Sequence, residues 1–156
     1  MAWKDFRGTA PAGNPYGATA NTGIAYGFKY AKAGDQVELT FDVFCYFDKN
    51  GSWSKKEKQT PKLLQHEQLH FDIAEIQARR LRKAFASATF TDNYKGEIKG
   101  IFDQHMKALI EMQQRYDQES DHSMIPEKQA EWEAYVRTGL EKTKGEAISS
   151  AVGMKL

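Results

Sequence analysis

The chain has 156 residues, 40% of them hydrophobic and 28% charged, a length that favours one domain with its own core. The 22 basic and 21 acidic residues nearly balance, which argues against a nucleic-acid partner held by a strongly basic surface. A single cysteine, Cys45, excludes an intramolecular disulfide, and no apolar run approaches the ~20 residues that cross a bilayer.

The N-terminal segment predicts little regular structure. Residues 1–6 contain no charged-then-apolar leader, which fits either a cytoplasmic protein or one whose export signal has been removed. Residues 8–21 concentrate glycine and proline, and they predict an irregular loop.

Two strands should follow this loop. Residues 24–30 alternate aromatic or aliphatic side chains with mostly small ones, and along residues 37–47 apolar side chains alternate with Glu38, Thr40 and Asp42. The segment 31–35 between them predicts a turn. We therefore expect an antiparallel pair of strands and take residues 1–58 as mainly β.

A long helix is expected next, with Thr60 as the N-cap and Pro61 at the first helical position. Its hydrophobic periodicity continues to about Ser87.

Two further helices should complete the chain. Apolar side chains step by three and four between residues 98 and 116, and Pro126 starts a third helix. We take residues 60–142 as mainly α and residues 143–156 as a loosely held tail. The expected fold class is α+β: one domain over residues 1–156, in which a small antiparallel sheet packs on about three helices.

The first of these helices carries the sequence His66-Glu67-Gln68-Leu69-His70, an H-E-x-x-H motif of zinc hydrolases. Side chains four residues apart lie on one face of a helix, so His66 and His70 can bind one ion. Glu67 can then take a proton from a metal-bound water without being a ligand. A catalytic zinc site has three protein ligands, so the third must come from elsewhere.

Helix geometry selects the third ligand. A short connection makes the second helix an antiparallel neighbour of the first. His105 then lies level with about residue 76, which is too far along the first helix to reach the motif histidines. We expect it to be a core-facing histidine with a hydrogen-bond partner. His122, in the connection that follows, is the preferred third ligand, and Asp117 and Glu119 remain alternatives.

Several segments resemble a bacterial family, DUF922, described as predicted secreted zinc-dependent proteases. They are residues 3–8, Gly51 to Trp53, His66 to Glu75, Ala78 to Leu81, Tyr116 to His122 and Gln129 to Trp132. Ser120 and Ser123 stand where the family usually has Thr and Gly. The resemblance implies a Zn²⁺-dependent peptidase, secreted or periplasmic, with His122 as a ligand. The H-E-x-x-H motif is similar to that of zincins, so the implied fold is zincin-like.

The resulting hypothesis is a zinc metallopeptidase that hydrolyses a peptide or protein substrate, with Glu67 as general base. Tyr116 either donates to the developing oxyanion or simply packs between helices. Residues 44–47 are our candidate for the sheet edge that binds the substrate. If Asp117 is not a metal ligand, it could orient the imidazole of one of the ligands. The alternative from another class is a zinc-stabilised binding module without hydrolytic activity, which would need no Glu67.

Overall fold

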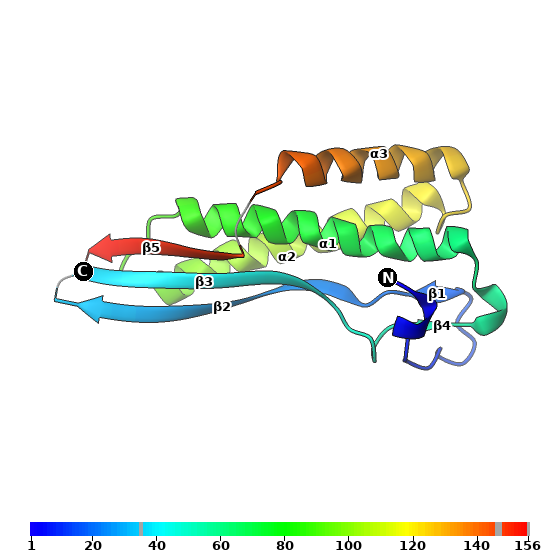
Figure 1. The fold of residues 1–156 in the computed structure, drawn as a ribbon, viewed down its shortest axis with the longest axis horizontal. Helices are drawn as coiled ribbons and strands as arrows, with labels where there is room; N and C mark the ends of the chain where they lie inside the picture. Colours follow the sequence, from blue (N-terminus) through cyan, green and yellow to red (C-terminus); the bar gives the residue numbers. More distant parts are fainter. Residues whose placement is uncertain (35, 146–147, 156) are drawn as a thin grey trace.

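The computed structural model describes residues 1–34, 36–145 and 148–155 and has the expected α+β architecture (Figure 1). The strands are β1 (Ala18–Thr19), β2 (Thr22–Ala33), β3 (Gln36–Phe47), β4 (Trp53–Ser54) and β5 (Ser149–Lys155). The helices are α1 (Pro61–Ser87), α2 (Tyr94–Ser120) and α3 (Pro126–Lys142), with 3-10 turns η1 (Trp3–Asp5) and η2 (Lys56–Lys58). Helix α1 is the centre of the fold, since it contacts the long sheet, α2 and α3.

The long sheet has the strand order β2-β3-β5, and all its pairs are antiparallel. The predicted pairing of the first two strands is confirmed, with Ile24 opposite Cys45. Alternate residues of β3 are buried beneath α1, and the rings of Phe41 and Phe85 stack with centroids 4.4 Å apart. The predicted turn is shorter than expected because β2 continues to Ala33, and Asp35 lies outside the described residues.

The three predicted helices are confirmed. Helix α1 begins at Pro61, and the Thr60 hydroxyl oxygen accepts a hydrogen bond from the Leu63 N–H at 3.1 Å. This cap satisfies a backbone donor that has no partner within the helix. None of the described helices is both long and apolar enough to span a membrane.

The prediction of a loosely held C-terminal tail is wrong for residues 149–155. They form β5, which pairs with β3 from Gln36 opposite Lys155 to Asp42 opposite Ser149. Small and polar residues give little local strand propensity, but the unpaired backbone edge of β3 offers hydrogen-bond partners from elsewhere in the chain. Residues 146, 147 and 156 of the predicted tail lie outside the described residues.

Candidate metal centre

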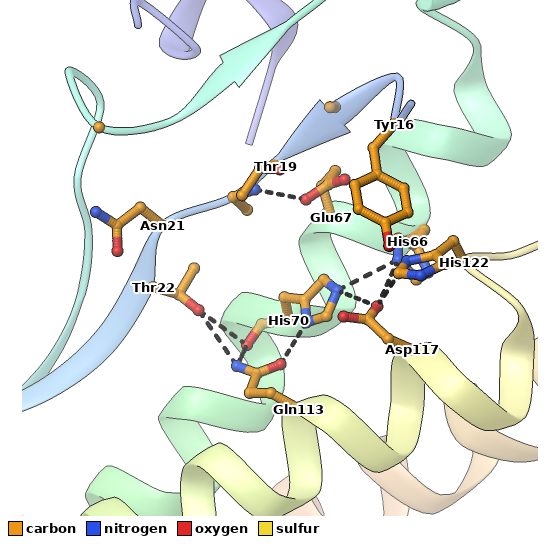
Figure 2. A pocket seen from close by; sticks show the side chains of 13 residues that line it. Tyr16, Thr19, Asn21, Thr22, His66, Glu67, His70, Gln113, Asp117 and His122 are labelled. Carbon is orange, nitrogen blue, oxygen red and sulfur yellow. Dashed lines mark hydrogen bonds and ion pairs between the residues drawn. The ribbon is translucent and has the colours of Figure 1, made fainter. Parts of the chain in front are cut away.

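A cavity of about 630 Å³ opens beside the N-terminal half of α1. Its walls come from the segment that leads into β2, from α1, from α2 and from the turn after α2 (Figure 2). His66, Glu67, His70 and His122, which the sequence singles out, all line it. Segments far apart in the sequence therefore meet around one concave site.

The two histidines of the motif lie side by side on α1. Both are buried, and their Nε2 atoms are 3.2 Å apart. The ring planes are nearly perpendicular, at 88°. Because α1 is continuous through the motif, the spacing of four residues places both rings on one face of the helix.

Asp117, near the end of α2, faces these two histidines. Its Oδ1 lies 3.2 Å from His66 Nε2 and 3.0 Å from His70 Nε2. This oxygen is buried, yet no N–H among the described residues is directed at it in hydrogen-bond geometry. Burial would raise the pKa of Asp117, but its contacts with the imidazoles outweigh burial and hold the pKa well below its usual range. Such spacing fits a bound cation, since two ligands of a tetrahedral centre lie about 3.4 Å apart.

His122 approaches Asp117 from the turn after α2, with Nδ1 3.4 Å from Asp117 Oδ1. His66, Asp117 and His122 each offer a ligand atom within 4.8 Å of the other two, so this group could hold a metal ion. The side chain of His122 is 39% exposed, against 3% for His66. The cluster thus has a buried side formed by the motif and an exposed side formed by the turn.

The turn that carries His122 has a strained backbone. Asp121, His122 and Ser123 all have positive φ angles, of 46°, 49° and 71°. Residues with a side chain adopt this left-handed conformation only at an energetic cost. Ser123 takes the left-handed conformation although it is not a glycine. Stored strain of this kind is typical of functional sites.

Glu67 is buried on the wall of the cavity. One carboxylate oxygen accepts a hydrogen bond from the Ala20 N–H at 2.6 Å, which fixes its position. Burial raises the pKa of Glu67, although the neighbouring His70 and His66 oppose that shift. A carboxylate whose pKa is raised toward neutrality is suited to accept and then release a proton.

Tyr116 does not line the cavity. It is fully buried, its ring packs on His66 with centroids 4.6 Å apart, and its hydroxyl donates to Gln129 Oε1 at 2.8 Å. Burial raises the pKa of its phenol. These contacts fit the packing role that the sequence left open beside the catalytic one.

Three other parts of the chain that the sequence analysis considered lie outside the cavity. Residues 44–47 do not line the cavity, because they lie in β3 against β2, and residues 18–22 line it instead. His105 lies outside the cavity as expected, but its buried Nδ1 has no hydrogen-bond partner among the described residues. Glu119 does not line the cavity either, and its carboxylate accepts a hydrogen bond from the Trp132 indole at 2.9 Å.

Comparison with known proteins places this site within a family. Residues 7–123 match the family described as "Bacterial protein of unknown function (DUF922)". The chain belongs to the DUF922 family. No curated protein and no solved structure gives a significant match. The family description assigns no activity.

Two residues at the site of this DUF922 protein were not singled out by sequence reasoning. The Tyr16 ring packs against His122 with ring centroids 4.3 Å apart and the two planes tilted by 41°, and its hydroxyl is directed toward the histidines (Figure 2). Gln113 contacts His70 from the side opposite Asp117 (Figure 2). Neither residue belongs to a motif, so only the fold could reveal them.

Proposed function

We propose that this DUF922 protein is a zinc-dependent metallopeptidase. The observation that carries the proposal is the buried Asp117 Oδ1, which lies 3.0 to 3.4 Å from nitrogens of three histidines and has no hydrogen-bond partner among the described residues. Imidazole nitrogens and carboxylate oxygens are the ligands that zinc takes in catalytic sites. The cavity beside them has the volume of a typical ligand cleft.

His66, His70 and Asp117 would hold the ion from the buried side, and His122 would contact it from the exposed turn. The first three ligand atoms lie within 3.2 Å of one another. His122 has the most exposed side chain of the four, so it is the group that a substrate could displace.

A zinc-stabilised binding module is the second candidate. Four convergent side chains favour it, because structural zinc sites are usually closed by four protein ligands. Glu67 and the adjoining cavity favour hydrolysis, because a structural site needs neither a buried carboxylate beside the ligands nor access for a substrate. The experiments on Glu67 below separate the two.

The proposed reaction is hydrolysis of a peptide bond. A bound zinc ion would polarise the carbonyl group and lower the pKa of a water molecule to about 7. Glu67 accepts the proton of the attacking water and then donates it to the leaving nitrogen. The Ala20 N–H keeps the carboxylate in position for both transfers. Residues 18–22, which line the cavity, would lie along the substrate.

Tyr16 is the side chain that we assign to the developing oxyanion, in place of Tyr116. Its phenol is directed toward the cluster, whereas the Tyr116 hydroxyl is bound to Gln129. Tyr16→Phe keeps the ring on His122 and should lower kcat by about 100-fold. Tyr116→Phe is the matched control, and it should lower thermal stability rather than kcat. Equal effects of the two variants on kcat would show that Tyr16 is not the oxyanion donor.

The test of the proposed function is Glu67→Gln. We expect the rate of cleavage of a peptide library to fall by about 10²- to 10⁴-fold, because the general base is lost, while the zinc content stays unchanged. Glu111→Gln, at an exposed position on α2, is the control and should change neither quantity. Undiminished cleavage by zinc-loaded Glu67→Gln would show that the base is wrongly assigned. A wild-type protein that binds zinc but cleaves no member of the library would support the binding module.

We also propose a secreted or periplasmic location and a peptide or protein substrate. Support comes from the resemblance to secreted zinc-dependent proteases, and the balanced charge gives no reason to expect a nucleic-acid partner. Fractionation of cells that carry the native gene should place the protein outside the cytoplasm, and recovery in the cytoplasm alone would contradict this.

A further inference from the structure

Both ring nitrogens of His70 are contacted by residues of α2. On the cavity side, Nε2 lies 3.0 Å from Asp117 Oδ1. On the other side, Nδ1 forms a hydrogen bond with Gln113 Oε1. Positions 113 and 117 are about one helical turn apart, so one face of α2 contacts both sides of the same imidazole.

The amide of Gln113 is held in a fixed orientation. Its Nε2 donates to the backbone carbonyl oxygen of His70 at 2.9 Å and to Thr22 Oγ1 at 3.3 Å. Because these two acceptors use the NH₂ group, the amide oxygen is the atom that faces His70 Nδ1. An amide oxygen can only accept, so the proton of the neutral imidazole must be on Nδ1. The lone pair of Nε2 is then directed toward Asp117.

The other histidine of the motif lacks this arrangement. His66 Nδ1 is buried and has no hydrogen-bond partner among the described residues. Of the two motif histidines, His70 is therefore the one whose tautomer is set by a neighbouring side chain. Gln113 itself lines the cavity, and Thr22 connects it to the start of β2.

We propose that Gln113 is a positioning residue that sets the tautomer and the ring orientation of His70, and so its strength as a metal ligand. This inference rests on the proposed metal site but not on hydrolysis. Partners that hold the second nitrogen of a ligating histidine typically contribute about 10- to 100-fold to metal affinity. We expect an effect of that size here.

The experiment uses the full chain with three substitutions. Gln113→Met removes the amide at nearly constant volume, Gln113→Glu keeps an acceptor for His70 Nδ1, and Gln114→Met changes the exposed neighbour as a control. Two quantities are measured: the Zn²⁺ affinity, by competition with a chromogenic chelator, and the ring ¹⁵N shifts of His70 in the metal-free protein at alkaline pH, where the imidazole is neutral.

Gln113→Met should weaken Zn²⁺ binding by about 10- to 100-fold and shift the His70 ring signals away from the Nδ1–H tautomer. Gln113→Glu should retain both the affinity and the tautomer, and Gln114→Met should resemble the wild type. Unchanged His70 signals in Gln113→Met would overturn the proposal, even if that variant is less stable. A wild-type protein that binds Zn²⁺ but hydrolyses no peptide would end the proposed function and leave this inference intact.

Discussion

Two clusters of polar side chains lie along helix α1, and they differ in whether their buried polar atoms have hydrogen-bond partners. The metal cluster, near the N-terminal half of α1, consists of His66, His70, Asp117 and His122. It gathers three histidines around a buried carboxylate oxygen that has no hydrogen-bond partner among the described residues.

The ion-pair cluster, on the C-terminal half of α1, consists of Glu75, Arg79 and Arg82. Glu75 Oε1 accepts from Arg79 Nε at 2.7 Å and from an Arg82 terminal nitrogen at 3.2 Å. Arg82 also donates to the carbonyl oxygen of Val43 at 3.0 Å, and Arg79 donates to that of Leu140 at 3.0 Å. These bonds connect α1 to β3 and to α3.

We infer from this difference that the ion-pair cluster serves stability and that the metal cluster serves a ligand. Buried polar groups are normally paired, because an unpaired one costs about 1 to 3 kcal/mol. The ion-pair cluster follows this rule, and the metal cluster departs from it at Asp117. Removing a carboxylate from each cluster should therefore have opposite consequences.

The largest expected effect is that of Asp117→Asn on metal binding. Loss of a ligand should weaken Zn²⁺ affinity by more than the roughly 10- to 100-fold that loss of an outer partner causes. Glu75→Gln, the matched change in the ion-pair cluster, should leave the affinity unchanged. Isothermal titration of the metal-free proteins measures both. Equal affinities of Asp117→Asn and wild type would mean that Asp117 is not a ligand.

The next effect is that of Glu75→Gln on folding. We expect the free energy of unfolding to fall by about 1 to 3 kcal/mol, because buried Arg82 loses its charged partner. Burial would raise the pKa of Glu75, but its bonds with Arg79, Cys45 and Arg82 hold it below its ordinary value of 4.5. A depressed pKa contributes stability that is present above pH 4.5 and is lost as the pH falls through the folded-state value.

Urea denaturation of the metal-free protein at neutral and at acidic pH tests this expectation. The difference between wild type and Glu75→Gln should shrink as the pH falls below 4.5. A difference that stays constant with pH would show that the ion pairs of Glu75 are not its cause.

The smallest effect concerns the strained turn that carries His122. Ser123→Gly should raise the free energy of unfolding by about 0.5 to 1 kcal/mol, because glycine adopts the positive φ of 71° without steric cost. Gln118→Gly, in the last turn of α2, should instead lower it by up to about 1 kcal/mol. Thermal unfolding of both variants provides the comparison. Destabilisation by Ser123→Gly would show that the backbone at this position is not strained.

Local signals were sufficient to predict most of the fold. The N-cap Thr60 and Pro61 fixed the start of α1, and the periodicity of its apolar residues fixed the end near Ser87. Strand β5 could not be predicted, because residues 149–155 acquire their structure from the edge of β3.

The candidate site could be predicted only where a residue type carries a chemical signal. The sequence predicted that His66, His70 and His122 lie together. The prediction came from the four-residue spacing of the first two and from the expected position of His122 along the helix pair. Gln113 is a neutral amide, and nothing in the sequence distinguishes it from Gln114. Tyr16 lies in an irregular loop, whose position depends on contacts such as the hydrogen bond from the Lys55 N–H to the Gly17 carbonyl oxygen at 2.8 Å.

The most direct test is anomalous diffraction at the zinc edge from crystals of the zinc-saturated protein. We predict one strong peak between His66 Nε2, His70 Nε2 and Asp117 Oδ1, with His122 at its exposed side. A zinc-saturated crystal with no peak at these atoms would contradict the metal centre and the hydrolase built on it.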